Sequence, residues 1–158
     1  MTRNSNFTFN WVLIRELAIG TAPKNQDHLT TLKDNGIKSI LSLCDISEAK
    51  PPEEINIFFN CERIVLPDHR IGRSLQVDEI IQTLIILKRL REYGPVFVHC
   101  VAGMERSPLI CIAWLIKYKA LTQQQAIDYL MQIHSNTNPL SSQLAVLRDK
   151  KFIEFSLP

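Results

Sequence analysis

The sequence predicts a single α/β domain, with a central, mostly parallel sheet of about five strands flanked by helices. Short apolar runs rich in Ile and Val alternate with longer segments whose apolar residues recur at helical spacing. The length of 158 residues suits one domain, and no repeat or Gly/Ser-rich linker divides it, so residues 1–158 are expected to form one unit. Hydrophobic residues make up 46% and charged residues 22%, which excludes disordered and fibrous classes.

The N-terminal part of the chain is expected to supply four strands. Residues 11–14 and 17–19 are short apolar runs typical of edge strands, and residues 26–36 have helical spacing that ends in an Asn-Gly helix stop. Residues 37–43 and 63–66 are mostly apolar and β-branched, as buried strands are, and they bracket a weak helix over 52–59.

The next segment is expected to form a helix and a strand. Ser74 has the chemistry of an N-cap, and apolar residues then recur at helical spacing from Val77 until Gly94 and Pro95 end the helix. Residues 96–98 form a short apolar strand that leads directly into the segment HCVAGMERSP.

The C-terminal part of the chain is expected to be helical. Residues 109–117 are apolar enough for a largely buried helix, and Thr122 and Gln125 have the spacing of a capping box. A last helix is expected over 140–152. Strands that alternate with helices predict a parallel sheet covered on both faces.

Charge and hydropathy exclude several classes of function. The chain has 18 Lys and Arg against 16 Asp and Glu, a formal net charge of +2, so no nucleic-acid or membrane partner is expected. The longest apolar stretch, residues 108–116, is about half the ~20 residues that span a bilayer, and residues 1–10 lack an apolar signal segment. A cytoplasmic protein is expected, while the oligomeric state stays open.

The cysteines separate into one functional candidate and three packing residues. No CxxC pair occurs and the histidines lack metal-ligand spacing, so neither a metal, a cofactor nor a disulfide framework is expected. Cys44, Cys61 and Cys111 lie in apolar strand or helix contexts, where a cysteine is usually inert. Cys100 differs because of its neighbours.

The segment at residues 99–108 has the residue types of an anion-binding loop. In α/β folds anions bind where a strand ends and a helix begins. Gly103 permits a tight turn, Arg106 supplies a planar guanidinium, and Ser107 with Pro108 begins a helix whose free N–H groups point back into the loop. We expect a cup for a tetrahedral oxyanion, with Cys100 as a thiolate beneath the central atom.

The string at residues 99–107, HCVAGMERS, resembles the signature of the protein tyrosine phosphatase superfamily, and the small dual-specificity branch fits best. That branch has a general-acid aspartate about thirty residues before its cysteine, and Asp68 lies 32 positions before Cys100. Residues 17–22 and 36–43 are similar to early strands of the family, and the resemblance covers residues 11–145. Ala18 stands where an aromatic residue is common, and Asn138-Pro139 only loosely matches the family's Pro-Asn.

The resemblance implies a cysteine-dependent phosphatase that acts on phosphotyrosine and phosphoserine or phosphothreonine through a cysteinyl-phosphate. Cys100 would attack phosphorus, Asp68 would protonate the leaving oxygen, and Ser107 would bond the thiolate. His99 would orient the loop between the last strand and its helix. Phosphate would be held by the loop residues Val101, Ala102, Gly103, Met104, Glu105 and Arg106.

Other functions for the same loop stay open. Phosphoinositides, RNA 5′-phosphates and phosphoglucans are alternative substrates, although a loop without Lys argues against a multiply phosphorylated lipid headgroup. A non-catalytic phosphate-binding module is a rival that the combination of Cys100, Asp68 and Arg106 argues against. Sulfur-transfer and arsenate-reducing enzymes also place a Cys in an anion loop, but they would not need Asp68.

Several polar residues have two interpretations. Glu105 would either pair outward with a Lys or Arg and brace the loop, or repel acidic substrates. Asp45, also at a strand end, is the substitute for Asp68 as general acid. His69, Arg70 and Arg73 form either a basic rim or a solvated loop.

Two histidines and two aromatic residues are assigned no chemistry. His28 and His134 lie in helical patterns and are expected to be surface or boundary residues. Trp114 and Tyr118 lie one helical turn apart and are expected in the core.

Overall fold

Five strands form one sheet in a computed structural model, of which residues 7–157 are described here. The strands are β1 (Phe9–Leu13), β2 (Leu17–Gly20), β3 (Ser39–Ser42), β4 (Asn60–Arg63) and β5 (Val96–His99). Their order across the sheet is β1-β2-β5-β3-β4, and every neighbouring pair is parallel except β1 with β2. The predicted five-stranded, mostly parallel sheet is confirmed.

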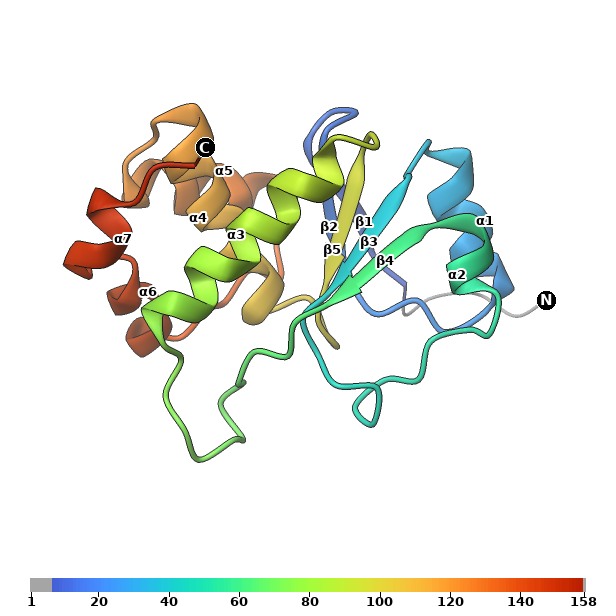
Figure 1. The fold of residues 1–158 in the computed structure, drawn as a ribbon, viewed down its shortest axis with the longest axis horizontal. Helices are drawn as coiled ribbons and strands as arrows, with labels where there is room; N and C mark the ends of the chain where they lie inside the picture. The colour runs from blue at the N-terminus through green and yellow to red at the C-terminus, as the bar shows by residue number, and fades with distance from the viewer. Residues whose placement is uncertain (1–6, 158) are drawn as a thin grey trace.

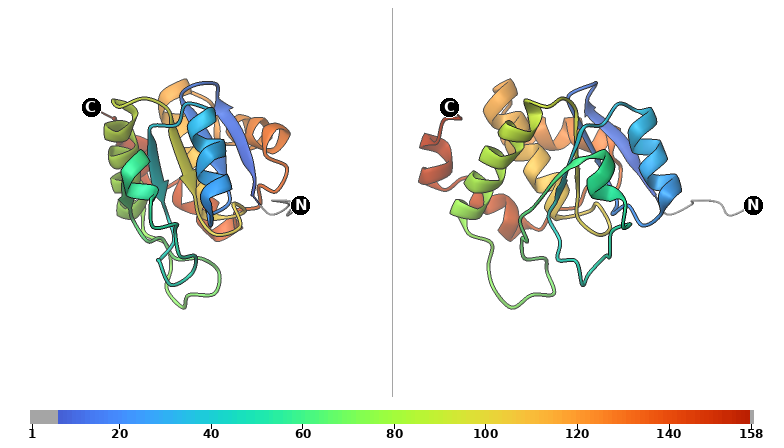
Figure 2. Two further views of the ribbon diagram at one scale, coloured as in Figure 1. Left: turned by 90° about the vertical axis from the view of Figure 1, so that its right-hand side faces the viewer. Right: turned by 45° about the vertical axis from the view of Figure 1, so that its right-hand side comes forward.

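Helices cover both faces of the sheet, as Figures 1 and 2 show. One face carries α1 (Gln26–Asp34) and α2 (Ile55–Phe58), which bury a small apolar cluster around Phe97. The larger helical layer lies on the other face and contains α3 (Val77–Arg91), α4 (Arg106–Lys119), α5 (Gln123–Ile133), α6 (Ser141–Val146) and α7 (Lys150–Glu154). Within the described residues, no helix is long and apolar enough to cross a membrane.

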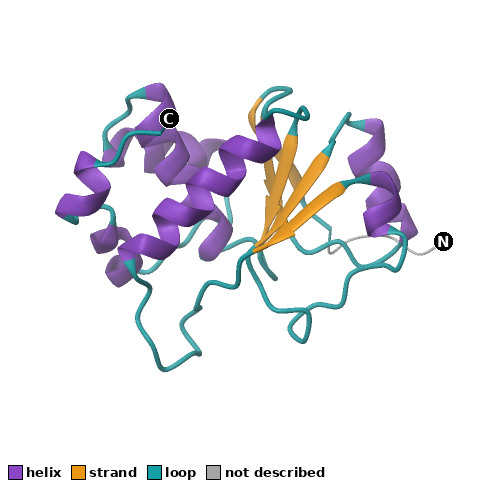
Figure 3. Ribbon diagram, viewed as in Figure 1, coloured by secondary structure: helices purple, strands orange, loops and turns teal. Residues whose placement is uncertain are grey.

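The sheet directs the site because its parallel strands all finish at one end. The long loops that follow β3 and β4 extend from that end, where β5 also runs into the connection to α4 (Figure 3). In the register, Ser42 of β3 and Gly20 of β2 lie on either side of His99, the last residue of β5. Residues that follow these strands are therefore brought together.

Two of the predicted strands differ from the structure. The strand at residues 17–19 is not an edge, since β2 pairs with both β1 and β5. The strand expected over 63–66 lies instead over Asn60–Arg63. Leu66 is fully buried and its N–H donates to the Leu43 carbonyl at 3.0 Å, so its apolar character reflects a buried loop beside β3.

Two helix boundaries differ from the prediction because a side chain other than the expected one makes the cap. The N-cap of α3 is Gln76 rather than Ser74, because the Glu79 carboxylate accepts the Gln76 N–H at 2.8 Å. The helix expected over 140–152 is divided into α6 and α7, since Asp149 accepts the Lys151 N–H at 2.8 Å and begins a new helix. The capping box of Thr122 and Gln125 is confirmed at the start of α5.

The expectations for the histidines and for Tyr118 are wrong in part. Trp114 is buried, but Tyr118 stacks on its ring at 4.0 Å and remains 42% exposed. His28 is buried against the Phe7 ring at 4.3 Å and accepts the Lys24 N–H at 2.9 Å. His134 is also buried, and its contacts belong to the site described next.

Candidate active site

The connection from β5 to α4, residues 100–106, is called the phosphate loop below. Its first carbonyl groups are turned outward. The Cys100 carbonyl accepts from His99 Nδ1 at 2.7 Å, and the Val101 carbonyl accepts from the Ala22 N–H at 3.1 Å. Because N–H and C=O point in opposite directions across a trans peptide, each outward carbonyl turns the following N–H toward the interior of the loop.

The second half of the loop is held in the same way by the segment after α5. His134 Nε2 donates to the Gly103 carbonyl at 2.6 Å, and the Asn138 N–H donates to the Met104 carbonyl at 2.7 Å. On the other side of its ring, His134 Nδ1 accepts from Asn10 Nδ2 at 2.9 Å, which fixes the tautomer that donates to Gly103. Nothing in the sequence indicated this role for His134.

Gly103 is required by the shape of the loop. Its φ of +69° lies in the left-handed region, and a Cβ built there would lie 2.9 Å from the Gly20 carbonyl oxygen. The loop therefore packs directly on the end of β2. Because Gly20 of β2 lies beside His99 of β5 in the sheet, this contact fixes the position of Gly103 relative to the strand that leads into the loop.

The loop encloses the Cys100 thiol at the floor of a cavity of about 510 Å³. Cys100 is only 3% exposed, and its Sγ lies 3.3 Å from the hydroxyl of the fully buried Ser107. Most of the predicted site residues meet at this cavity, whereas His99, Gly103 and Ser107 do not line it. The cavity is lined by Asp68, His69, Arg70, Cys100, Val101, Ala102, Met104, Glu105, Arg106, Asn138 and Leu140.

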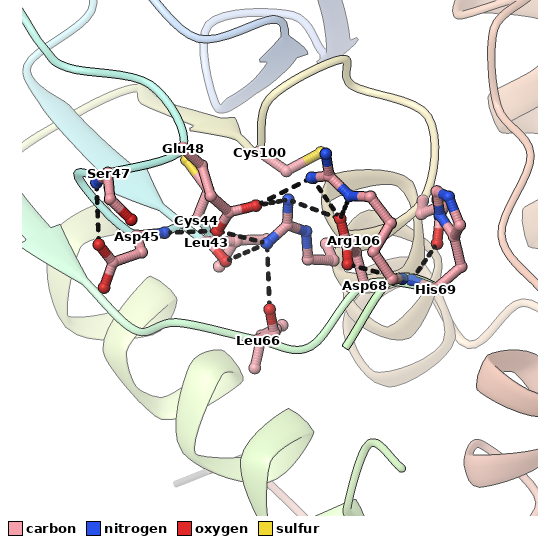
Figure 4. Close-up of polar contacts among 12 residues, drawn as sticks. Leu43, Cys44, Asp45, Ser47, Glu48, Leu66, Asp68, His69, Cys100 and Arg106 are labelled. Atoms are coloured by element: carbon pink, nitrogen blue, oxygen red, sulfur yellow. Dashed lines mark hydrogen bonds and ion pairs between the residues drawn. The ribbon is translucent and has the colours of Figure 1, made fainter. Parts of the chain in front are cut away.

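Arg106 is held by groups from two loops, the one after β3 and the one after β4 (Figure 4). Its Nη1 donates to the Leu66 carbonyl at 3.1 Å and lies 3.5 Å from the Leu43 carbonyl. The Glu48 carboxylate accepts from Nη2 at 3.0 Å and from Nη1 at 3.2 Å, a two-point contact with the end of the guanidinium. These contacts fix the plane of a side chain that is 3% exposed.

Glu48 is a site residue that the sequence analysis missed. Its hydrogen bonds from Arg106 are the main reason that its pKa is lowered, so the carboxylate remains charged beside the arginine. One signal was available. Glu48 follows β3, the neighbour of β5 in the sheet, and residues after neighbouring parallel strands meet at the same edge.

Asp68 lies in the loop after β4, residues 64–76, called the acid loop below. Its Oδ1 accepts the Arg70 N–H at 2.9 Å, its Oδ2 accepts from Arg70 Nε at 2.8 Å, and Arg106 Nη2 lies 3.8 Å away. Burial raises the pKa of Asp68, but the hydrogen bonds from Arg70 and the charge of Arg106 outweigh it and leave the pKa below its ordinary value.

Asp45 is placed elsewhere. It is exposed and does not line the cavity, and its carboxylate accepts the Ser47 N–H at 2.9 Å in a local turn. The structure thus brings Asp68, and not Asp45, to the Cys100 cavity.

His99 lies behind the loop as a neutral side chain. Burial lowers the pKa of His99 to about 4. With Nδ1 donating to the Cys100 carbonyl, its Nε2 is left to accept from the Ser42 hydroxyl at 2.7 Å. His99 therefore connects the loop to β3 and carries no proton for the cavity at neutral pH.

The charged residues around the cavity pair with one another. The first interpretation of Glu105 supposed that it pairs with a Lys or Arg. In the structure Glu105 instead contacts His69 and Gln143. Arg70 bonds Asp68, and Arg73 pairs with Glu79 at 2.6 Å. His69 and Arg70 line the cavity, whereas Arg73 does not.

The other three cysteines do not line the cavity. Cys44 and Cys111 are buried, and Cys61 is half-buried. Burial raises the pKa of each thiol, to about 11 for Cys61. The neutral thiol form is therefore favoured at all three positions.

Comparison with known proteins places the chain among phosphatases. The family model for the dual specificity phosphatase catalytic domain matches residues 19–151. The chain is 48% identical over 46 residues to human dual specificity protein phosphatase 5, which is 29% of this chain and 12% of that protein. It is 27% identical over 142 residues to the Arabidopsis thaliana phosphatidylglycerophosphate phosphatase PTPMT2, or 88% of this chain and 61% of that protein.

Solved structures show the same fold. The crystal structure of PTPMT1 in complex with PI(5)P has a TM-score of 0.77 at 19% identity and covers 91% of this chain and 93% of the other. The structure of Tk-PTP in its active form has a TM-score of 0.75 at 19% identity, with 92% and 96% covered. The chain spans between 12% and 61% of the length of the two curated relatives named above. Since the family model matches residues 19–151, most of the chain, this protein belongs to the dual specificity phosphatase catalytic domain family.

Proposed function

We propose that this protein is a cysteine-dependent phosphomonoester hydrolase that acts on phosphorylated proteins, with tolerance for phosphotyrosine, phosphoserine and phosphothreonine. The observation that carries the proposal is the phosphate loop, whose carbonyls are bonded outward while the Cys100 sulfur lies at the floor of the cavity that the loop encloses. Inward amides and a buried arginine suit a dianion with tetrahedral oxygens.

Arg106 would bind two phosphate oxygens. Glu48 and the loop carbonyls engage the Nη1 and Nη2 end of the guanidinium. Its Nε–H and the adjacent Nη2 proton remain as a second edge with the geometry for a bidentate contact. This edge would stabilise the charge that develops on the equatorial oxygens.

In the first step the Cys100 thiolate forms a bond to phosphorus while the bond from phosphorus to the leaving oxygen breaks. Asp68 gives its proton to that oxygen, so the leaving group departs neutral. Asp68 and Cys100 line the same cavity, which supports these paired roles.

In the second step a water molecule gives its proton to Asp68 and its oxygen attacks the phosphorus of the cysteinyl-phosphate. The sulfur leaves as a thiolate. The Ser107 hydroxyl, 3.3 Å from Sγ, would donate to the departing sulfur and stabilise its charge. Inorganic phosphate and the original enzyme result.

The cavity walls favour a phosphorylated side chain over a polyanion. Met104 and Leu140 line the cavity and are 41% and 37% exposed, so an aryl or alkyl group can pack on them. Glu105 also lines the cavity, and its charge would oppose a second phosphate group.

A phosphorylated lipid headgroup is the second candidate substrate. It is supported by the relative PTPMT2, named as a phosphatidylglycerophosphate phosphatase, and by the fold shared with PTPMT1 in complex with PI(5)P. Phosphopeptides, phosphatidylglycerophosphate, phosphoinositides, RNA 5′-phosphates and phosphoglucan, compared as substrates by phosphate release, would distinguish the candidates.

The test of the proposed chemistry is hydrolysis of p-nitrophenyl phosphate without added metal. Wild-type turnover inhibited by vanadate is expected, with no turnover in Cys100→Ser and a fall of about a hundredfold or more in Asp68→Ala. A Cys100→Ser variant that binds vanadate without turnover confirms that the loop is intact. Turnover by Cys100→Ser at the wild-type rate would contradict the proposal.

A further inference from the structure

Glu105 connects the phosphate loop to the acid loop. Its Oε1 accepts the His69 backbone N–H at 3.2 Å, and its Oε2 contacts His69 Nδ1. From the other side, Gln143 Nε2 donates to Oε1 at 3.3 Å. Both carboxylate oxygens are therefore engaged, and the side chain is only 16% exposed although its charge lies beside an anion-binding loop.

The backbone contact fixes the main chain next to Asp68. A carboxylate that accepts the N–H of residue 69 restricts the peptide that joins residues 68 and 69, and with it the direction of the Asp68 side chain. The ring contact alone would not do this, because it holds the His69 side chain, which is 56% exposed, and not the main chain.

The other contacts of Asp68 do not replace this connection. Arg70 bonds Asp68 from within the acid loop, so it moves with that loop. Its link outward, from Nη2 to Glu48 at 3.3 Å, belongs to a guanidinium whose side chain is 62% exposed. The Arg106 contact with the Leu66 carbonyl holds the start of the acid loop, two residues before Asp68.

We propose that Glu105 is a positioning residue that holds the acid loop over the phosphate loop and so presents Asp68 to the leaving oxygen. The inference rests on the proposed phosphatase function. Glu105 touches neither phosphate nor leaving group in this role, and it acts through His69.

This role predicts a dependence on the leaving group. A poor leaving group, such as phenolate, needs the proton of Asp68, whereas an acidic phenol departs without it. Misplacing Asp68 therefore slows the hydrolysis of esters with poor leaving groups and has little effect on esters of acidic phenols. A displacement of about 1 Å from a productive geometry can cost about a hundredfold.

The experiment measures kcat/KM for aryl phosphates whose phenols span pKa values from about 5 to about 10. For Glu105→Ala we expect a loss of about tenfold or more with phenyl phosphate and less than about threefold with the most acidic phenol. The inhibition constant of vanadate, which reports the phosphate loop, should stay within about threefold of wild type. His69→Ala should show a smaller loss, since the backbone contact survives.

Two further variants complete the test. Glu105→Gln keeps an oxygen for the His69 N–H, so it should restore much of the phenyl phosphate activity; it also decides the matter if Glu105→Ala does not fold. Glu62→Ala removes a surface carboxylate that pairs with Arg89 at 2.8 Å and should leave the whole series unchanged.

The outcomes separate this inference from the proposed function. An equal loss across the series, or a loss of vanadate binding, would show that Glu105 supports only the phosphate loop and would overturn the inference. A wild-type protein without activity toward any aryl phosphate would overturn the proposed function, and the inference with it.

Discussion

Two arginines, Arg70 and Arg106, favour the charged form of Asp68, and Arg70 has the larger effect. Burial alone would raise the pKa of this carboxyl, which is only 7% exposed, but two hydrogen bonds from Arg70 reverse the direction. A general acid must carry its proton at the working pH, so a lowered pKa restricts the reaction to more acidic conditions. Arg70 thus has two opposing effects: its hydrogen bonds orient the Asp68 carboxyl, and they also decrease the fraction of Asp68 that is protonated.

Removing the Arg70 side chain should extend activity to higher pH. In Arg70→Gln the Asp68 pKa rises, so the alkaline limb of the kcat/KM profile for phenyl phosphate moves to higher pH. The Arg73→Gln variant removes another arginine of the same loop, one that pairs with Glu79 of α3, and should keep the wild-type profile. An alkaline limb that moves downward in Arg70→Gln would exclude Arg70 as the cause of the lowered pKa.

For single residues, sequence analysis identified those that belong to a rare motif and missed those of a type that is common in its position. Cys100, Arg106 and Ser107 became candidates because their offsets are specific. Glu48 and His134 were missed because a Glu in a loop and a His in a helix are ordinary until the fold brings them to Arg106 and Gly103.

The phosphate loop is the element that depends most on backbone conformation. Gly103 and Gly36 both have positive φ, +69° and +80°, but only Gly103 has a close neighbour, the Gly20 carbonyl. These two glycines allow backbone strain to be separated from steric contact.

Gly103→Ala should damage the loop more than Gly36→Ala damages its turn. We expect a decrease of about 2–3 kcal/mol in the free energy of unfolding for Gly103→Ala and about 1 kcal/mol for Gly36→Ala, measured by urea denaturation. Vanadate affinity should fall at least about tenfold in Gly103→Ala alone. Equal effects of the two substitutions would show that the contact with Gly20 is unimportant.

Element boundaries were predicted well where a local motif makes the cap. Thr122 caps α5 from a position just before the helix, which the sequence displays directly. The prediction of Ser74 as N-cap was wrong because Glu79 makes the cap of α3 from inside the helix. The helix predicted over 140–152 is divided because Asp149 acts as a second N-cap. Competing caps differ by about 1 kcal/mol, which packing easily outweighs.

For the whole molecule, buried histidines make folding sensitive to acid. Burial lowers the pKa of His99 to about 4 and also lowers the pKa of His28 and His134. At a pH between the unfolded pKa near 6.5 and the folded pKa, His99 is protonated in the unfolded chain and neutral in the folded protein. The unfolding free energy therefore decreases as the pH falls through this range.

His99→Gln should reduce this acid sensitivity. A glutamine can donate to the Cys100 carbonyl and accept from Ser42, as His99 does, without titrating. From pH 7 to pH 4 we expect the wild type to lose about 3 kcal/mol more of its unfolding free energy than His99→Gln, by denaturant titration at each pH. Parallel pH dependence in the two proteins would contradict a neutral, buried His99.

The sequence by itself determined the alternation of strands and helices, the anion-binding loop at residues 99–108 and the general-acid candidate Asp68, because each is written in local spacing. Only the tertiary structure decided that Glu48 holds Arg106, that His134 supports Gly103, and that Glu105 meets His69. These contacts join residues 31 to 58 positions apart. Sequence spacing specifies neighbours along an element, whereas parallel strand order and loop packing decide which distant side chains meet.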